Sequence, residues 1–290
     1  MKKDRDLGQK FTPFLVVAFV VILLYVISLL IPLAWALMTS LKSNTEFRVN
    51  IIGFPKQLVF NYVYVFKRYY VPVSGEKIYM ARLFLYSLLY AGGCALTNTL
   101  VPCLTAYTCA KFPYKLSAVI HTTVVIVMII PIIGSLPAEV QMASDLRLYN
   151  HIWGLWIMKA NFLGMYFLVF YNVFKAFPSA YSEAAKIDGA SNFAVMVRIM
   201  LPLVRNTFFT VYLLNFITYW NDYQTPLIFI PSYPTVALGM YRMAKTTINE
   251  LAKIPMRLTA AMLMFLPIFI LFVAFNKRLL GNLTLGGIKG

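Results

Sequence analysis

The polar side chains best suited to binding chemistry lie inside apolar segments of the chain. Asn215, Tyr219 and Asp222 are spaced at i, i+4 and i+7, so they share one face of a helix. Trp220 and Asn221 lie beside that face. Aromatic rings cover the apolar C–H face of a sugar, while amide and carboxyl groups bond its hydroxyls. The spacing therefore predicts a carbohydrate-binding surface.

A second polar group, Lys159 and Asn161, lies in a different apolar segment. An ionisable side chain at membrane depth is costly, so it is a functional candidate by default. A simpler interpretation is that Lys159 pairs with Asp222. The simpler interpretation of Asn215 is likewise structural: its amide can form a polar contact between helices.

The chain lacks the residue patterns of an enzyme. His121 and His151 lie in separate segments and do not make a metal site. Cys94, Cys103 and Cys109 have no metal-ligand spacing and are expected to be packing residues. The serine-hydrolase pattern Gly-x-Ser-x-Gly, the zinc pattern His-Glu-x-x-His and the nucleotide pattern Gly-x-x-x-x-Gly-Lys-Ser/Thr are absent from the sequence. We therefore expect no catalysis, metal or cofactor in this chain.

The elements that position these residues must be membrane helices. Of the 290 residues, 60% are hydrophobic and 12% charged, whereas soluble domains contain roughly 45–50% and about 25%. A bilayer needs about 20 apolar residues per helix. The windows that meet this need are residues 12–39, 83–110, 116–136, 151–174, 206–230 and 258–275. Six spans would place both termini on one side.

The segments between the windows are basic and aromatic. Residues 40–82 mix charges with aromatic rings, which predicts an interfacial helix. Residues 231–257 form a second large loop on the same side. About half of the 26 lysines and arginines fall on each side of the membrane, so the positive-inside rule does not orient the chain. The net charge of +16 instead points weakly to an acidic solute.

The loop at residues 175–204 has its own local signals. Ser179 and Ser191 each suit a helix N-cap, and Gly189 suits a left-handed helix stop. Between them, residues 181–187 are compatible with about two helical turns. Small residues and acids in this loop suit a closely approaching cationic partner. An ordinary solvated loop between helices is the alternative interpretation.

A longer pattern runs through the same loop. Glu183-Ala184-Ala185 is followed by three residues and Gly189, then nine residues and Ile199, then one residue and Leu201-Pro202. This pattern resembles the EAA signature of bacterial ABC importer permeases. The variant Ile187-Asp188-Gly189-Ala190 resembles the carbohydrate-uptake branch, and the chain is similar to its maltose-type second permease.

The resemblance implies a fold and a location. It implies an all-α integral membrane protein with six transmembrane helices of the type I ABC importer permease fold. Residues 1–290 would form a single permease domain in a bacterial inner membrane, with both termini cytoplasmic. The EAA loop, residues 175–204, would then be cytoplasmic as well.

The resemblance also implies partners. These are a second homologous permease, two ATPase subunits that bind ATP and Mg, and a solute-binding protein. Glu183 would pair with a basic ATPase residue, and Gly189 would fix the turn. The implied ATPase-coupling residues are Ser182, Glu183, Ala184, Ala185, Ile187, Asp188, Gly189, Ala190, Ile199, Leu201 and Pro202. The cytoplasmic tail at residues 277–290 would reach between the ATPases through Thr284, Gly286, Gly287 and Lys289.

The expected function is oligosaccharide import. The predicted substrate-path residues are Lys159, Asn161, Asn215, Tyr219, Trp220, Asn221 and Asp222. In the loop at 231–257, Tyr233, Met240, Tyr241, Arg242 and Lys245 would face the binding protein. Lys159 and the basic outer loops suggest an acidic substrate, such as a uronate derived from alginate or pectin. The alternative is a stand-alone secondary transporter or channel, but its internal repeats or charged relay are not seen in the sequence.

Overall fold

A computed structural model describes residues 13–112, 114–130, 134–245 and 252–283, with side chains described up to Phe275. The chain divides into two compact units. The first contains Met1–Val65 and Thr247–Leu263, and the second contains Phe66–Thr246 and Met264–Gly290.

The first unit is built around the last turn of a long apolar helix. It holds α1 (Pro13–Ser40), α2 (Asn44–Val49), the start of α3 (Asn61–Arg68) and the start of α15 (Ile254–Leu283). The Ser40 carbonyl accepts hydrogen bonds from Asn61 Nδ2 at 2.9 Å and Thr259 Oγ1 at 3.0 Å. Lys42 is fully buried and donates to the Asn50 carbonyl at 2.8 Å. These bonds fasten the end of α1 to α3, α15 and the following loop.

The second unit opens with a β-hairpin, β1 (Tyr70–Val73) and β2 (Glu76–Tyr79). The strands pair antiparallel with Tyr70 opposite Tyr79 and Val73 opposite Glu76. Ser74 and Gly75 both have positive φ, 49° and 87°, as a tight two-residue hairpin turn requires. The sequence interpretation did not include this hairpin.

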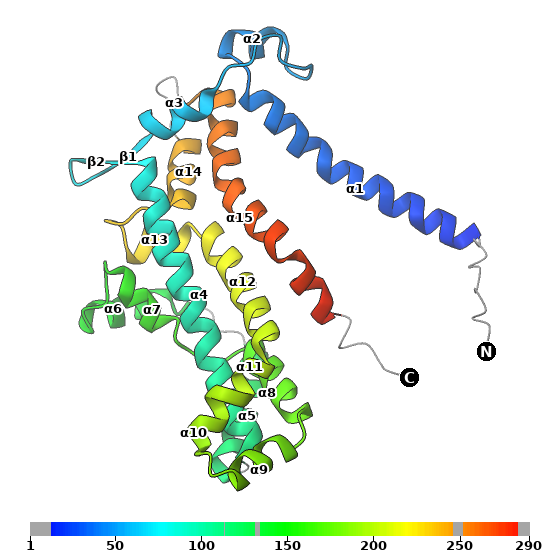
Figure 1. The fold of residues 1–290 in the computed structure, drawn as a ribbon. Helices are drawn as coiled ribbons and strands as arrows, with labels where there is room; N and C mark the ends of the chain where they lie inside the picture. Colours follow the sequence, from blue (N-terminus) through cyan, green and yellow to red (C-terminus); the bar gives the residue numbers. More distant parts are fainter. Residues whose placement is uncertain (1–12, 113, 131–133, 246–251, 284–290) are drawn as a thin grey trace. The chain divides into compact units, whose positions relative to one another are not determined.

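Helices make up the rest of the second unit (Figure 1). They are α4 (Met80–Lys111), α5 (Lys115–Ile129), α6 (Leu136–Asp145), α7 (Ile152–Met158), α8 (Met165–Ala176), α9 (Ala180–Ile187), α10 (Asn192–Val195), a π-helix (Met196–Met200), α11 (Leu201–Leu203), α12 (Arg205–Asn221), α13 (Gln224–Phe229), α14 (Val236–Lys245) and the rest of α15.

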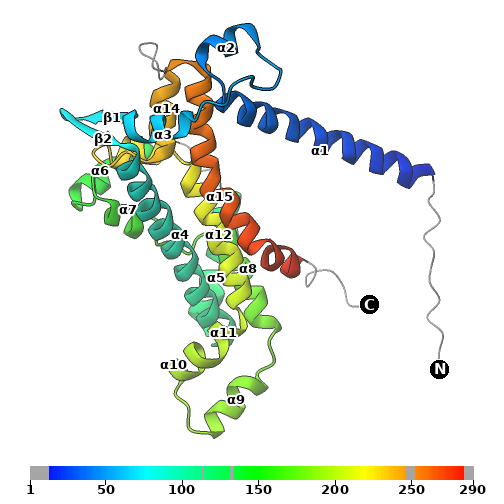
Figure 2. The same ribbon diagram turned by 45° about the horizontal axis from the view of Figure 1, so that its top comes forward.

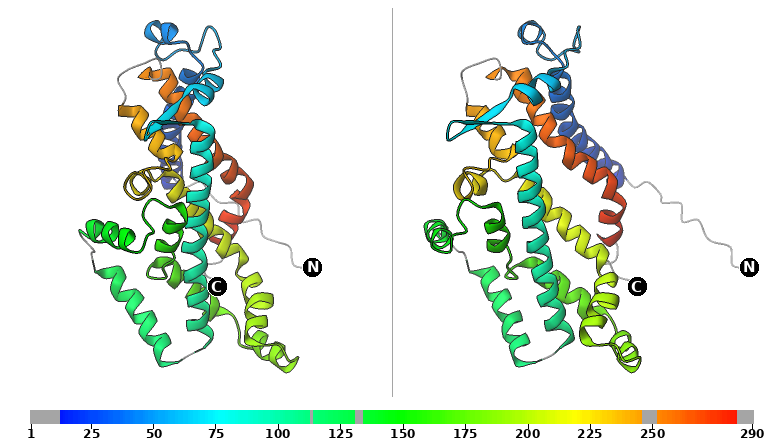
Figure 3. Two further views of the ribbon diagram at one scale, coloured as in Figure 1. Left: turned by 90° about the vertical axis from the view of Figure 1, so that its left-hand side faces the viewer. Right: turned by 60° about the vertical axis from the view of Figure 1, so that its left-hand side comes forward.

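Helix α4 is the centre of this unit. It packs along α12 and is covered by α7 nearer its first residue and by α8 nearer its last (Figures 1 and 3). Two buried clusters follow, one around Tyr90, Cys94 and Trp220, the other around Cys103, Phe170 and Met200. The three cysteines are buried and free, as expected of packing residues.

Fewer unbroken spans are present than the windows predicted. In the described part of the chain, α1, α4 and Ile254–Phe275 are long and apolar enough to cross a membrane. A fourth forms if Asn192–Leu203 and Arg205–Asn221, bent by 71°, count as one. Helix α5 is a shorter apolar helix, ending at Ile129. Six spans therefore stays a prediction.

The prediction of continuous helix across residues 151–174 is wrong. Helix α7 ends at Met158 and α8 begins at Met165. Asn161 Oδ1 accepts the N–H of Leu163 at 2.5 Å, so a short polar side chain competes with the helical bonds. Gly164 is fully extended, with φ 164° and ψ −179°. We call residues 159–164 the α7–α8 elbow.

The window at 206–230 is also interrupted, at Asp222. Its carboxylate accepts the N–H groups of Gln224 at 2.9 Å and Thr225 at 3.1 Å. These are bonds of the kind that start a new helix, so α12 ends at Asn221 and α13 begins at Gln224.

The α4–α7 contact yields a packing prediction. A Cβ on Gly93 would lie 2.1 Å from Trp156 Nε1, which donates to the Leu89 carbonyl at 3.0 Å. We therefore expect Gly93→Ala to destabilise the fold by about 1–3 kcal/mol. Gly92→Ala is the matched control, because its Cβ would meet only Tyr212 Oη at 3.8 Å. Thermal unfolding in detergent should show a lower midpoint for G93A, and equal midpoints would contradict the tight contact.

Candidate functional site

The EAA loop forms a short exposed helix, α9, which lies beyond the Lys111 end of α4 (Figures 1 and 2). Glu183 and Ala184 are exposed, as are Ile187 and Asp188. Ala185 packs against the buried cluster behind the loop. The acidic Glu183 and the small Ala184 are therefore accessible on the surface of α9.

The turn after α9 follows the sequence prediction. Gly189 has φ +82°, the left-handed conformation that favours glycine. Beside it, the N–H of Ala190 donates to the Ala185 carbonyl at 2.9 Å. Ser191 caps α10, its Oγ accepting the N–H of Ala194 at 3.2 Å. The cap expected from Ser179 is wrong: its backbone is already helical and its side chain makes no cap bond.

The loop is fastened to the end of α4 by two lysines. Lys111 Nζ donates to the Phe177 carbonyl at 2.7 Å, just before α9. Lys186 Nζ, in the last turn of α9, lies 5.9 Å from the centre of the Phe112 ring. Contacts therefore join α4 to both ends of α9.

A cavity of about 150 Å³ opens between α9, α10 and the end of α4. One carboxylate, two ammonium groups, three hydroxyls, one amide and two aromatic rings line it. The two lysines already contact the Phe177 carbonyl and the Phe112 ring, so the Glu183 carboxylate is the group that can receive a cationic side chain. The lining residues are Tyr107, Lys111, Phe112, Ser179, Ser182, Glu183, Lys186, Asn192 and Val195.

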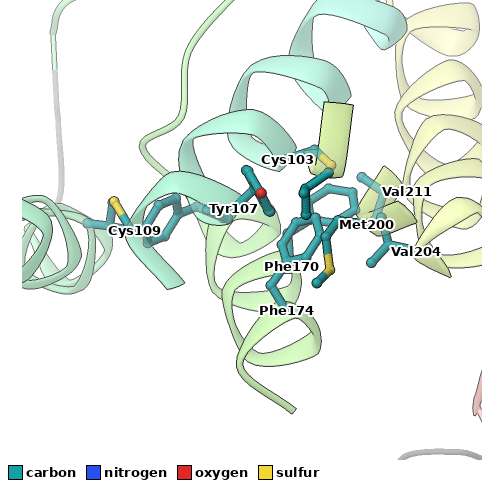
Figure 4. Close-up of a cluster of buried hydrophobic side chains, with 12 residues drawn as sticks. Cys103, Tyr107, Cys109, Phe170, Phe174, Met200, Val204 and Val211 are labelled. Carbon is teal, nitrogen blue, oxygen red and sulfur yellow. The ribbon is translucent and has the colours of Figure 1, made fainter. Parts of the chain in front are cut away.

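The end of the EAA pattern forms the bend behind the loop. Met196–Met200 is a π-helix, and Pro202 follows in the first turn of α11. Ile199 and Leu201 are half-buried. Figure 4 shows Met200 and Val204 packed with Phe170 of α8 and Cys103 of α4. Through α10 and the π-helix, α9 is thus joined to both α8 and α12.

A polar network joins α4 and α12 within the apolar interior. Asn98 Nδ2 donates to Asn215 Oδ1 at 3.1 Å and to Tyr219 Oη at 3.0 Å. Asn215 Nδ2 donates to Thr99 Oγ1 at 3.0 Å. Asn215 and Tyr219 are 3% and 9% exposed, so a ligand does not reach them in this state. Of the two interpretations that the sequence allowed for Asn215, the structure therefore favours the polar contact between helices.

The other path residues predicted at the end of α12 each have a different partner. Trp220 is 1% exposed and donates to the Met264 carbonyl at 3.1 Å. Asn221 is exposed and donates to the Ile217 carbonyl within its own helix. Asp222 accepts from Tyr90 Oη at 2.9 Å. Of the predicted face, Tyr219 and Asp222 do come together, through the edge-to-face contact of Tyr90 with Tyr219.

Lys159 and Asn161 lie in the α7–α8 elbow. Lys159 is half-buried, and Asn161 is exposed. The expected pair of Lys159 with Asp222 is not formed, since Arg82–Glu76 is the one ion pair within 4 Å in the described part of the chain. The elbow and Asp222 both lie against α4: Asn161 lines a cavity with Asn98, and Asp222 accepts from Tyr90.

The segment at 231–257 forms α14 in its described part. Tyr233 packs edge-to-face on Tyr86, with ring centres 5.3 Å apart. Tyr241 stacks on Tyr223 at 4.3 Å, and Lys245 Nζ lies 4.4 Å from its ring centre. Hydrogen bonding to Tyr241 raises the pKa of Lys245.

The other residues predicted for this loop are less informative. Met240 is half-buried. Arg242 donates to the Pro72 carbonyl of the hairpin at 3.4 Å. The predicted tail residues Thr284, Gly286, Gly287 and Lys289 lie outside the described residues.

The sequence interpretation missed four residues that hold these sites together: Tyr90, Asn98, Thr99 and Lys111. The first three lie on α4 and bond side chains of α12 or of Asp222 directly after it. An asparagine and adjacent threonine inside an apolar window were the available signal for Asn98 and Thr99. Lys111 looked like an ordinary turn residue, and only the fold brings it to Phe177.

Residues 99–283 match the protein family described as the binding-protein-dependent transport system inner membrane component. The chain belongs to this family. The match includes the EAA loop, α12 and α15, so the resemblance carried by Glu183 to Pro202 is confirmed at the level of the family. The permease is therefore an inner-membrane component.

Individual relatives cover nearly the whole permease. It is 25% identical over 264 residues to the melibiose/raffinose/stachyose import permease protein MelC of Bacillus subtilis (strain 168), covering 90% of this chain and 91% of MelC. It is 28% identical over 268 residues to the sulfoquinovosyl glycerol transport system permease protein SmoH of Agrobacterium fabrum (strain C58 / ATCC 33970), covering 90% and 89%.

A solved structure shares the fold. It is a bacterial ABC transporter involved in the import of the acidic polysaccharide alginate. The superposition has a TM-score of 0.76 at 19% identity and covers 91% of the permease and 95% of the matched chain. The permease thus has the type I ABC importer permease fold.

The amide network yields a stability prediction. Asn98→Ala would leave Asn215 Oδ1 and Tyr219 Oη without their shared donor. We expect a loss of about 1–3 kcal/mol, the usual penalty for an unsatisfied buried polar group. Asn172→Ala, at an exposed amide of α8, is the control. Unfolding in urea–detergent mixtures should separate the two variants, and unchanged stability of N98A would show that the network is not structural.

The Lys111 contact yields a prediction about loop opening. Lys111→Met removes the donor to the Phe177 carbonyl and frees the start of α9. We expect trypsin to cut after the exposed Lys186 about tenfold faster, the loss expected for a hydrogen bond from a charged group. Lys115→Met alters an exposed lysine at the start of α5 and should leave the rate unchanged. Equal cutting of both variants would mean that Lys111 does not hold the loop.

Proposed function

We propose that this permease is one membrane subunit of an ATP-driven importer that translocates an oligosaccharide delivered by a solute-binding protein. The observation that carries the proposal is the exposed α9, whose Glu183 lines a cavity at the end of α4 in a member of this family. The remaining partners are a second homologous permease and two ATPase subunits, which bind ATP and Mg.

The geometry of α9 supports a coupling role. An ATPase arginine would pair with the exposed Glu183 carboxylate at the cavity, whose two lysines already contact the Phe177 carbonyl and the Phe112 ring. Displacement of α9 would then reach α4 through Lys111 and α12 through α10 and the π-helix. Since α4 and α12 are joined by amide bonds, they would move together between inward- and outward-open states.

The topology follows from the two ends of α4. Its 32 residues extend about 48 Å, enough to cross a bilayer of about 40–45 Å with its headgroups. The hairpin precedes Met80, and α9 is fastened near Lys111. With α9 at the cytoplasmic ATPases, the hairpin and α14 are extracytoplasmic. Six spans with both termini cytoplasmic complete this topology.

The proposed substrate is an acidic oligosaccharide. The relatives MelC and SmoH belong to sugar transport systems, and the transporter that shares the fold is involved in the import of an acidic polysaccharide. Within this chain, Lys159 in the α7–α8 elbow and the net charge of +16 support an anionic solute.

The coupling role is tested at the EAA loop. We expect Glu183→Gln and Gly189→Val each to lower sugar uptake and sugar-stimulated ATPase activity together, by about tenfold. The first loses a charged contact, and the second forces a β-branched residue to the φ of +82° seen at Gly189. Both activities are measured with the complete importer in proteoliposomes.

Asp145→Asn is the matched control for charge, because Asp145 is an exposed carboxylate on α6, away from α9. It should leave uptake and ATPase activity unchanged. Normal uptake and ATPase activity in both EAA-loop variants would remove the coupling assignment.

A further inference from the structure

We propose that the α7–α8 elbow is an anion-binding subsite on the sugar path, in which Lys159 binds a carboxylate of the passing oligosaccharide. The inference rests on the proposed function and adds to it the group that recognises the substrate's charge. It also divides the predicted path residues into those that contact the sugar and those that support the helices.

The elbow lies level with the middle of α4. Trp156, three residues before Lys159, donates to the Leu89 carbonyl, and Asn161, two residues after it, lines a small cavity together with Asn98. Leu89 and Asn98 are the tenth and nineteenth of the 32 residues of α4, so at 1.5 Å per residue each is at least about 13 Å from either end. The elbow therefore belongs to the central part of the membrane rather than to a headgroup layer.

The Lys159 backbone is bonded to Leu155 and Asn161, but its ammonium group has no hydrogen bond or ion pair with any described residue. The acid that could pair with it, Asp222, is already engaged by Tyr90 Oη and by the N–H groups of Gln224 and Thr225. An unpaired charge at the bilayer centre costs a few kcal/mol or more, and such residues usually face a water-filled path and act in transport. The arrangement leaves the cation available to a ligand.

The backbone of the elbow gives a second, independent argument. Non-helical backbone at membrane depth is tolerated where it is buried in protein or lines an aqueous cavity. Ala160, Asn161 and Leu163 are exposed, so this segment is not buried by its own chain. Interrupted membrane helices are also where transporters bind solutes.

The open side of the elbow has groups that can bond a sugar. Asn161 uses its Oδ1 to hold the Leu163 N–H, which leaves its exposed amide N–H groups free to donate. A cavity of about 20 Å³ separates the elbow from Asn98 and Tyr166. That volume holds about one water molecule. The sugar therefore binds on the outer, exposed side of the elbow, where the second permease would complete the site.

The residues on α12 are excluded by the same reasoning. Asn215 is bonded to Asn98 and Thr99, Tyr219 to Asn98, and Trp220 to the Met264 carbonyl. All three are buried. These α12 residues support the packing of the helices beside the sugar path, and the elbow residues contact the sugar.

The charge of the substrate provides the test. The complete importer in proteoliposomes is assayed for uptake of trimannuronate, trigalacturonate, maltotriose and raffinose. We expect at least one acidic trisaccharide to be taken up by the unaltered importer, and Lys159→Gln to lower that uptake by about tenfold or more. Lys159→Arg should retain most of it, and Lys115→Gln, at an exposed lysine of α5, should change nothing.

The outcomes separate the two proposals. Uptake of neutral sugars alone would overturn the anion subsite and leave the importer function standing. Equal loss of acidic and neutral uptake in K159Q would give Lys159 a purely structural role and overturn the subsite. Uptake of none of the four sugars would count against both the proposed function and the subsite.

A labelling experiment tests the position of Lys159 without relying on uptake rates. Lys159→Cys is placed in a chain whose three buried cysteines are replaced by alanine, and an anionic methanethiosulfonate reagent is added. We expect the new thiol to react and the transported acidic trisaccharide to slow the reaction. Absence of reaction with and without ATP, or no protection by the sugar, would overturn the proposal.

Discussion

The amide pair of Asn98 and Asn215 is the interaction on which the second unit depends. In a low-dielectric interior, an unsatisfied amide is more costly than in water, so α4 and α12 are held where both amides find partners. Thr99 and Tyr219 take the remaining bonds. With the register of these two helices fixed, α7 and α8 can pack on α4, and the bend at Pro202 can deliver the chain from α9 into α12.

The same constraint distinguishes the two polar regions of the permease. Between α4 and α12 the polar side chains satisfy one another and are closed to solvent, which is the pattern of a structural contact. In the α7–α8 elbow, Lys159 remains unpaired and Asn161 is exposed. A polar group within the membrane that its own chain does not satisfy must be satisfied by water, a partner or a ligand. Function is therefore best sought at the elbow.

Local rules predicted what depends on near neighbours. The φ of Gly189 and the cap of Ser191 follow from a few adjacent residues. The helical face predicted to include Asp222 does not continue that far, because α12 ends at Asn221. Hydropathy could not predict the elbow, because the apolar window is continuous and the break depends on Asn161 and Gly164. Lys111 and Asn98 gain their roles from partners more than 60 residues away, which spacing along the chain cannot reveal.

Helix α4 also connects the two ends of its unit mechanically. The hairpin leads directly into it, since Tyr79 is its N-cap, and Lys111 holds the EAA loop at its other end. If a rod of about 48 Å tilts by about 5°, its far end shifts by about 4 Å. The turn at Ser74 and Gly75 would therefore move when α9 moves. In the proposed topology, a spectroscopic label at this turn would report the ATPase cycle from the opposite face of the membrane.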